Sequence, residues 1–389
     1  SPSLRFPEFT GEWEKCKLGT LATKVGSGST PKGGDAVYTS IGHYFVRSQN
    51  VGMGFLMLDN IAHINDDIHQ KHKATEIYEN DVLLNITGAS IGRTAVATKE
   101  LEGGNVNQHV CIIRTNSKVN PKFLCDYIQT QRIQNHIKSL QTGGSREGLN
   151  FEQIRSFPIS LPSINEQNKL TCLLDKINER IATQVRLIED LKKLRCAIVE
   201  KMFKQSKANG RLGDFIEQVS VRNKNGLYSN VLSVSNKQGF VKQSEQFEDR
   251  TVASEDTSNY KIVKRNNFAY NPARINVGSI ARLTKFDVGI VSPMYVCFRT
   301  KASIIPEYME AFFTSQQFFY EMMKRLEGSV RLCLSYEGLC NIPVYIPDMN
   351  KQIAMGQNIS LILSKIGLEI EYLGRLHQQK QYLLRKMFI

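Results

Sequence analysis

Few residues of this sequence have the types and spacing that catalysis needs. The segment Gly26-Ser27-Gly28-Ser29-Thr30-Pro31-Lys32 is glycine-rich, but it does not complete the glycine pattern of a nucleotide-binding loop. The eight cysteines include no C-x-x-C pair, and no His/Cys spacing fits a zinc site. We therefore expect no bound metal, reduced cysteines and a cytoplasmic protein.

The remaining polar residues suit binding, because Arg, Lys, Asn and Gln can contact phosphates and read base edges of DNA. They gather in glycine-punctuated stretches that resemble surface loops. The candidate DNA-binding residues of the first half are Ser27, Thr30, Lys32, Tyr44, Arg47, Ser48, Asn50, Thr87, Ser90, Arg93, Ser145 and Arg146. Those of the second half are Arg222, Lys224, Tyr228, Asn271, Arg274, Asn276, Ser329 and Arg331.

Each of these candidates has a competing interpretation. A polar residue in a loop can simply be solvated. Arg146 and Arg331 each follow a glycine or serine turn at the same place in their half, so for this pair the alternative is a structural salt bridge.

The chain contains an internal repeat with an offset of 185 residues, since Lys201-Met202-Phe203 recurs at 386–388. Toward the start of each half the offset grows, so that Leu18-Gly19 aligns with Leu212-Gly213. The period is too long for a solenoid and predicts two homologous domains, each followed by a homologous connector. The halves diverge most between 26–80 and 220–266, which indicates the same kind of task on different targets.

Each half reads as short strands and turns with a helix at 121–139 or 306–326, so we predict an α+β fold of two mixed domains. Apolar residues in 165–203 and 350–388 alternate spacings of four and three, which is a heptad seam. The predicted division is a first domain at 1–162, a helical spacer at 163–205, a second domain at 206–347 and a second spacer at 348–389. Packing of these helices on the domains as ordinary surface helices is the alternative.

The seam contains polar residues at matching places in both helices. The connectivity favours an antiparallel pair, in which Arg195 would face Glu369 and Gln184 would face Lys380. Each layer would then be complementary and could fix the register.

The overall charge supports these interpretations only weakly. There are 50 Lys and Arg against 37 Asp and Glu, a net charge of +13, which favours a polyanionic partner. No apolar run approaches the length of a transmembrane helix, and we expect neither a signal peptide nor a membrane partner.

Two rival functions are considered. One rival is a single-chain DNA methyltransferase or restriction enzyme, because Asn271-Pro272-Ala273-Arg274 faintly resembles the Asn-Pro-Pro-aromatic motif of amino-methyltransferases. The segment lacks the second proline and the aromatic residue, and no glycine-rich cofactor loop precedes it. Six of the seven histidines lie in the first half without a second-half counterpart, so no role common to both halves can use them. The other rival is a coiled-coil scaffold without DNA contact.

Several stretches carry a resemblance to a known family. They are Leu4-Arg5-Phe6-Pro7-Glu8-Phe9 with Trp13, Gly28 to Lys32, Arg47 to Val51, Leu83 to Arg93, Asn107-Gln108-His109, Gly143 to Leu149 and Glu166-Gln167. Together with the repeat and its helical connectors, they resemble the specificity (S) subunits of type I restriction–modification systems. The second half departs from the pattern, because Asn350-Lys351-Gln352 replaces the usual Glu-Gln and Asn271 to Arg274 replaces the Thr-Gly turn.

The resemblance implies two target recognition domains, each reading one half of a bipartite site in double-stranded DNA. It adds Asn107 and Gln108 to the candidate DNA-binding residues. It also implies that the helical spacer sets the half-site separation and docks two modification subunits, which bind S-adenosylmethionine. Motor–nuclease restriction subunits would use ATP and Mg²⁺. This chain would be non-catalytic and bind no cofactor itself. The recognised bases and the spacer length do not follow from the sequence.

Overall fold

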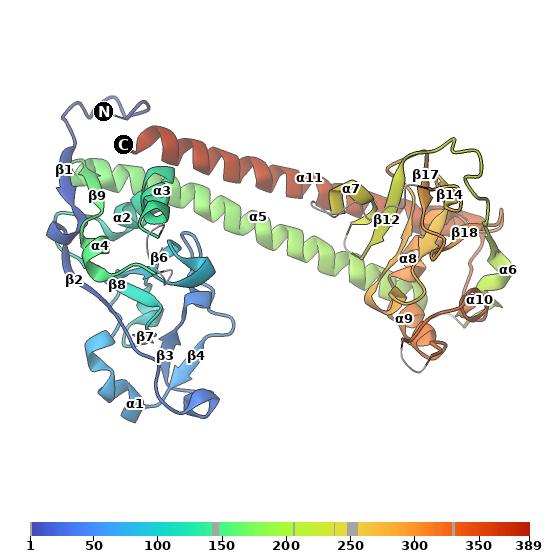
Figure 1. Cartoon of the computed structure of the whole chain (residues 1–389), viewed down its shortest axis with the longest axis horizontal. Helices are drawn as coiled ribbons and strands as arrows, with labels where there is room; N and C mark the ends of the chain where they lie inside the picture. Colours follow the sequence, from blue (N-terminus) through green and yellow to red (C-terminus); the bar gives the residue numbers. More distant parts are fainter. Residues whose placement is uncertain (1, 142–147, 205–206, 237, 247–255, 329–330) are drawn as a thin grey trace. The chain divides into compact units, whose positions relative to one another are not determined.

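The computed structural model describes the chain except for residues 1, 142–147, 205–206, 237, 247–255 and 329–330. The candidates Ser145, Arg146 and Ser329 therefore lie outside the described residues. The chain divides into two compact units (Figure 1), Ser1–Gln184 with Tyr372–Ile389 as unit 1 and Val185–Glu371 as unit 2. We describe each unit by itself.

Unit 1 contains two sheets and a ribbon. The larger sheet has the order β2-β8-β5-β6, the smaller sheet has the order β4-β3-β7, and β1 pairs with β9. All pairs are antiparallel except β3 with β7. The strands are β1 Glu14–Lys17, β2 Ala22–Ser27, β3 His43–Val46, β4 Ala62–Ile64, β5 Val82–Asn85, β6 Thr94–Val96, β7 Asn105–Val106, β8 Val110–Thr115 and β9 Pro158–Leu161. The helices before the connector are α1 Asp66–Lys71, α2 Pro121–Ile128, α3 Gln131–Ser139 and α4 Phe151–Arg155.

Unit 2 has an equivalent larger sheet and ribbon, and its smaller sheet contains one strand more, β14. Its sheets have the orders β11-β18-β15-β16 and β13-β12-β17-β14, with β12 parallel to β17, and β10 pairs with β19. The strands are β10 Gly210–Arg211, β11 Ile216–Gln218, β12 Val231–Ser235, β13 Gly239–Lys242, β14 Lys261–Lys264, β15 Phe268–Tyr270, β16 Ile280–Arg282, β17 Val288–Val291, β18 Val296–Thr300 and β19 Pro343–Val344. The helices are α6 Leu212–Phe215, α7 Gln243–Gln246, α8 Pro306–Phe313, α9 Gln316–Met323 and α10 Tyr336–Cys340. Helices α8, α9 and α10 begin 185 residues after α2, α3 and α4, which confirms the predicted repeat.

The central strands of the larger sheet in unit 1 are buried on both faces, since all of β5 and the first four residues of β8 are buried. Val82, Leu84 and Ile113 belong to the core that contains Phe123 and Tyr127 of α2. The alternate residues Leu83 and Ile112 instead pack with Val46 and Val106 of the smaller sheet. This division follows from the two-residue period of a strand. Figure 1 accordingly shows the smaller sheet on the side of the larger one that faces away from α5.

Both units hold the start of their connector with a buried glutamine. Gln167 accepts a hydrogen bond from Asn120 N (2.8 Å) and donates to Lys118 O (3.2 Å) and Pro162 O (2.9 Å). Gln352, at the equivalent position, accepts from Ile305 N (3.0 Å) and donates to Ser303 O (3.1 Å) and Pro347 O (3.0 Å). The shared glutamine of the repeat is thus explained by the chain entering α2 or α8 beside the start of a long helix.

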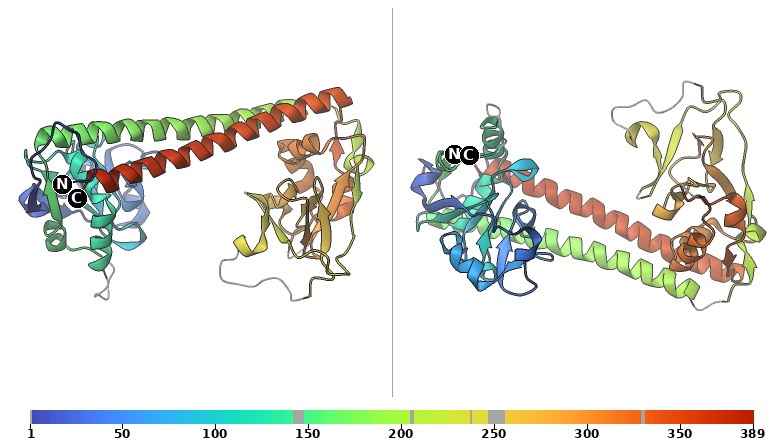
Figure 2. Two further views of the ribbon diagram at one scale, coloured as in Figure 1. Left: turned by 90° about the horizontal axis from the view of Figure 1, so that it is seen from above. Right: turned by 60° about the horizontal axis from the view of Figure 1, so that its bottom comes forward.

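The two connectors are long helices, α5 Ile164–Lys204 and α11 Met349–Met387. In unit 1 they run antiparallel, because Leu170 and Leu174 near the start of α5 share a core with Leu384 near the end of α11. Further along, Arg180 Nη2 donates to Tyr372 Oη (2.6 Å). The N-terminal segment joins the same end, where Leu4 N donates to Lys386 O (2.9 Å), and Figure 2 shows the two termini close together.

The pairing of polar layers stays a prediction, and the described contacts of two of its residues lie within their own units. Lys380 Nζ donates to Gln129 Oε1 (3.1 Å) just after α2, and Glu369 forms an ion pair with Lys365 on its own helix. Arg195, 185 residues before Lys380, lines a cavity with Glu310 of α8. The Lys380 ammonium is therefore bonded to an amide of its own unit, which offsets part of the cost of burying it.

None of the helices in the described part of the chain is long and apolar enough to cross a membrane.

Candidate nucleic-acid interface

Backbone hydrogen bonds in unit 1 gather several polar loops at one edge of the sheets, where β2, β3, β5 and β7 end. Gly28 N donates to Asn107 O (3.1 Å), Asn107 N donates to Val46 O (3.0 Å), and Ile86 N donates to His109 O (3.0 Å). We call residues 27–32, 46–50, 85–93, 107–109 and 148–149 the first loop cluster. It contains most of the candidate residues of the first half.

Gly28 makes this arrangement possible. A Cβ atom on Gly28 would lie 1.7 Å from Val106 O, which no side chain can tolerate. The glycine lets the loop after β2 run against the backbone that follows β7.

Two asparagine candidates shape the cluster from within. Asn50 is 3% exposed, accepts from Arg47 N (3.0 Å) and donates to Met57 O (2.9 Å). Asn107 is 6% exposed, and its carbonyl accepts from His109 N (3.1 Å). Both amides therefore hold loop backbone, and the structure gives these residues positioning roles rather than contact surfaces.

The other candidates of the first half differ in accessibility. Thr30, Lys32, Arg93 and Gln108 are exposed, whereas Ser27, Arg47, Ser48, Thr87 and Ser90 are half-buried. The Arg47 guanidinium lies over the Tyr38 ring, 5.4 Å from its centroid. Tyr44 donates to Glu100 Oε1 (3.3 Å) and packs against His63, so its hydroxyl is used within the unit.

His109 is a residue that our sequence-based candidate set missed. Its Nδ1 lies 2.6 Å from Thr87 Oγ1 and its Nε2 lies 3.0 Å from Gln108 Nε2. Gln108 Oε1 in turn accepts a hydrogen bond from Thr30 Oγ1. The Asn107-Gln108-His109 stretch was visible in the sequence, but only folding shows that its side chains join three separate loops.

Unit 2 brings its own polar segments to the equivalent edge. Ser279 Oγ donates to Val234 O (3.1 Å), and Leu334 N donates to Pro272 O (3.1 Å). Lys261, the first residue of β14, donates through Nζ to Tyr295 O (2.6 Å) and pairs with Arg222 in a β-bridge. We call residues 221–230, 235–236, 271–279, 292–295 and 331–334 the second loop cluster.

The candidates of the second cluster are mostly accessible. Arg222, Lys224, Arg274 and Arg331 are exposed, and Tyr228 and Asn276 are half-buried. Arg222 Nη1 donates to Asn259 Oδ1 (2.9 Å). Asn271 is 8% exposed and accepts from Ala273 N (3.1 Å), so its side chain shapes the turn.

For Arg331, the alternative to a DNA contact was a structural salt bridge. Within the described part of the chain, its side chain belongs to no ion pair. A Cβ on Gly328 would lie 2.4 Å from Arg331 O, and Gly328 has a φ of +118°. A glycine turn therefore sets the path of the backbone that carries this exposed arginine.

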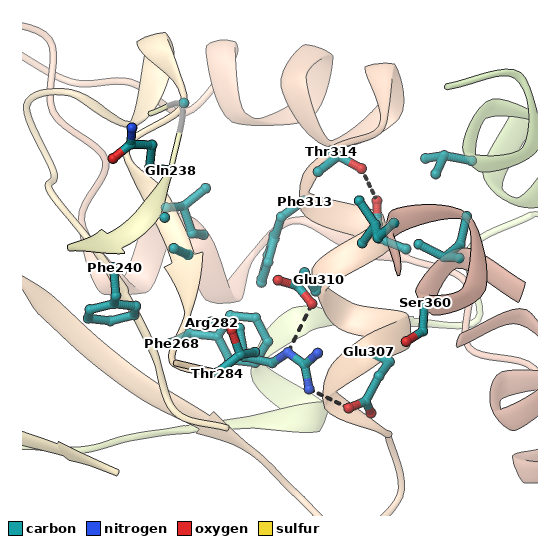
Figure 3. A pocket seen from close by; sticks show the side chains of 18 of the residues that line it. Gln238, Phe240, Phe268, Arg282, Thr284, Glu307, Glu310, Phe313, Thr314 and Ser360 are labelled. Carbon is teal, nitrogen blue, oxygen red and sulfur yellow. Dashed lines mark hydrogen bonds and ion pairs between the residues drawn. The ribbon is translucent and has the colours of Figure 1, made fainter. Parts of the chain in front are cut away.

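Unit 2 also contains a cavity of about 520 Å³ between β13, β16, α8 and the segments of the long helices in this unit (Figure 3). Arg282 Nε donates to Glu310 Oε2 (2.9 Å), and Arg282 also pairs with Glu307. Burial raises the pKa of Glu310, an effect that the neighbouring Arg282 offsets only in part. The charges of the cavity are thus largely matched within the unit. In the described residues no group of three His, Cys, Asp or Glu side chains is placed to hold a metal.

Comparisons with known proteins agree with this architecture. A family model described as the type I restriction modification DNA specificity domain matches residues 10–193. The specificity subunit of the type I restriction enzyme EcoBI from Escherichia coli is 24% identical over 135 residues, which cover 34% of this chain and 28% of that protein. The matched part thus spans less than a third of the curated relative.

Solved structures match along the whole chain. The S subunit of a type I restriction–modification system from M. genitalium has a TM-score of 0.60 at 17% identity, covering 100% of this chain and 99% of that one. A chain from a study of complex assembly and conformational transition of the type I R-M system has a TM-score of 0.58 at 14% identity, covering 97% and 98%. The fold of the chain is therefore that of these solved structures, with two topologically similar α/β units and long helical connectors. Residues 10–193 match the type I restriction modification DNA specificity domain.

Proposed function

We propose that this chain is the DNA-recognition subunit of a type I restriction–modification complex and that each loop cluster reads one half of a bipartite duplex site. One observation carries the proposal. The same edge of two topologically equivalent units presents exposed polar and basic side chains, while the loops that bear them differ in sequence. A shared framework with divergent loops would read two different half-sites.

The chemistry of the two clusters fits duplex DNA. Exposed Lys32 and Arg93 in the first cluster, and Lys224 and Arg274 in the second, can neutralise phosphates and release counterions. The hydroxyl of Thr30, the amide of Gln108 and the guanidinium of Arg331 are groups of the kind that read base edges in the major groove.

The long helices fit a docking role. They expose large apolar side chains to solvent, among them Leu361, Leu368 and Ile370 at 68%, 63% and 50%. We infer that this surface receives two modification subunits and that the helices set the separation of the half-sites. S-adenosylmethionine would bind to those subunits, and ATP with Mg²⁺ to motor–nuclease subunits. This chain would contribute recognition and no catalytic group.

The test uses the full chain assembled with its modification subunits and a library of randomised duplexes. We expect selection of one asymmetric bipartite site, and we expect Arg331→Ala to weaken binding through one half-site by about tenfold. Arg265→Ala is the matched control. Arg265 is also exposed, but it follows the end of β14 that is farther from the second loop cluster, and it pairs with Asp287. Unchanged affinity and selectivity of Arg331→Ala would contradict the assignment.

The rival functions give different results in the same assays. Methyl transfer by the purified chain alone would favour a single-chain enzyme. Failure of the assembled complex to retain any duplex would favour a scaffold without DNA contact.

A further inference from the structure

Four side chains of the first loop cluster form a continuous hydrogen-bonded series across three loops. Thr30, in the loop after β2, donates to Gln108 Oε1. Gln108 Nε2 lies 3.0 Å from His109 Nε2, and His109 Nδ1 lies 2.6 Å from Thr87 Oγ1, in the turn after β5. The backbone bonds from Gly28 N to Asn107 O (3.1 Å) and from Ile86 N to His109 O (3.0 Å) hold the same loops in place.

The order of donors and acceptors in this series is constrained. A neutral imidazole has one N–H and one lone pair, and an amide has a donor end and an acceptor end. With Gln108 Nε2 donating to His109 Nε2, the ring carries its hydrogen on Nδ1 and donates it to Thr87 Oγ1. The hydroxyl hydrogen of Thr87 is then free to donate to a ligand. The hydroxyl hydrogen of Thr30 is already used on Gln108, so Thr30 can offer a ligand only lone pairs.

The opposite polarity is equally consistent and exchanges the two roles. If the ring hydrogen moves to Nε2 and the Gln108 amide turns over, Thr30 gains the free donor and Thr87 becomes the acceptor. In a neutral series, one threonine therefore always offers a ligand a hydrogen-bond donor, while the other offers only lone pairs. Thr30 is exposed and Thr87 is half-buried, and both lie on the loop cluster.

We propose that His109 is a positioning residue that couples Thr30 and Thr87, so that they read one half-site as a linked donor–acceptor pair. This inference rests on the proposed function. It names His109 and the linkage between two loops as determinants of specificity.

The second unit cannot form the same series, which provides an internal comparison. Leu84 pairs with Cys111 in unit 1, and Tyr270 pairs with Val296 at the equivalent rung of unit 2. Counting from these rungs, Thr87 corresponds to Ala273 and His109 corresponds to Met294. A loss of the coupling should therefore affect one half-site only.

The test is selection from randomised duplexes by the full chain assembled with its modification subunits. We compare His109→Phe, which keeps a planar ring without polar nitrogen atoms, with His109→Gln, which keeps one donor and one acceptor. For His109→Phe we expect selectivity to fall about tenfold at the bases of one half-site that Thr30 and Thr87 face, as for the loss of one good base contact. His109→Gln should recover most of that selectivity, and the other half-site should be unaffected.

A double-mutant comparison tests the coupling itself. Thr30→Val and Thr87→Val should be non-additive, with the double variant losing clearly less selectivity than the product of the single losses. Thr20→Val is the matched control, because the Thr20 hydroxyl donates to Lys17 O (2.8 Å) just before the start of β2, away from the first loop cluster. Thr87→Ser keeps the hydroxyl and should preserve selectivity. This variant provides a second measurement if Thr87→Val folds poorly.

Each outcome bears on the proposal. Unchanged selectivity in His109→Phe, equal losses in His109→Phe and His109→Gln, additive threonine losses, or a change in both half-sites would overturn the coupling. If the wild-type complex selects no bipartite site, the proposed function itself fails, and that result is distinct from a wild-type site that survives all of these substitutions.

Discussion

The first loop cluster is built by residues whose own side chains contribute little contact surface. Gly28 permits a close backbone approach, and Asn50 and Asn107 satisfy loop backbone from buried positions. They determine where Thr30, Gln108 and Arg93 are presented. If the cluster binds DNA as proposed, residues of this kind are as important as those that would touch the duplex, because a displaced loop presents the wrong group.

Gly28→Ala tests this positioning. The added methyl group would collide with Val106 O, so the loop after β2 must move away from the turn that follows β7. We expect a loss of about 1–3 kcal/mol in the free energy of unfolding and weaker binding through one half-site. Gly26→Ala is the control, since a Cβ there would meet nothing within 4 Å. Equal urea midpoints for the two variants would contradict the steric argument.

Asp126 provides a prediction about pH. Burial raises the pKa of this carboxyl to about 7, although the nearby Lys380 acts in the opposite direction. A folded pKa above the unfolded value means that folding favours the protonated acid, so stability falls as the pH rises from about 4 to about 7 and then stays constant. Asp126→Asn should remove this dependence and stabilise the protein at pH 8 by on the order of 3 kcal/mol.

Urea denaturation of unit 1 at pH 5 to 8 measures the effect of Asp126→Asn. Glu102→Gln, at an exposed position, is the control and should leave the pH profile unchanged. A wild-type profile that is flat between pH 5 and 7 would show that the carboxyl is ionised without penalty in the folded state.

At the scale of elements, the two long helices end in equivalent aromatic anchors. Phe388 is stacked on Phe123 with ring centroids 5.4 Å apart and meets Trp13 edge-on at 6.5 Å. Phe203, at the same position of the repeat, lies 5.2 Å from Tyr308 and 5.1 Å from Phe312. In each unit the last turn of one long helix thus completes the core beside α2 or α8.

Phe388→Ala should destabilise unit 1, and Phe203→Ala should destabilise unit 2, each by about 3–5 kcal/mol, because both remove a buried ring. Amide hydrogen exchange in α2 and in α8 reports the two units separately. Leu194→Ala, which truncates a side chain 49% exposed on α5, should change neither. If Phe388→Ala reduced protection in α8, or Phe203→Ala reduced protection in α2, the assignment of each anchor to its core would be wrong.

The apolar spacing predicted both connectors, and the connectivity of the chain predicted their antiparallel course. Neither signal predicts the surroundings of Lys380 and Arg195 within each unit. Gln129 and Glu310 belong to segments that lie 251 and 115 positions away in the sequence, and only the packed unit brings them together. A helix-by-helix comparison cannot include such partners.

The candidate site was predictable in its segments and not in its individual side chains. The glycine-punctuated loops of both halves do converge at one edge, since β-strand ends place consecutive turns together. Asn50, Asn107 and Asn271 were indistinguishable from base-reading asparagines, because the same amide that reads adenine also satisfies loop backbone. His109 was not among the predicted residues, because only the folded turn shows the contacts of its ring with Thr87 and Gln108.

For the whole molecule, the net charge of +13 predicts binding to a polyanion without predicting which bases are read. Under the proposed function, specificity would come from the two loop clusters, and the larger sheets beneath them have equivalent strand orders. Within unit 1, residues 26–93 supply the end of β2, the smaller-sheet strands β3 and β4, and the strand β5 with its turn. This segment contains most of the first cluster and none of the long helices.

Replacing residues 26–93 with the same segment of a relative should therefore change one half-site and leave the other half-site and the spacing unchanged. The graft must keep Gly28 and the alternating apolar residues of β5, because these join the segment to Val106 and to both cores. It must also keep Asn85, whose amide donates to Ser48 O within the segment. Duplex selection by the assembled complex, followed by methylation sequencing of a host that expresses it, measures both half-sites and the spacing. Replacement of 220–266 should alter the opposite half-site. If either graft changed both half-sites or the spacing, the clusters would not be independent reading surfaces, and recognition would have to be assigned to the chain as a single unit.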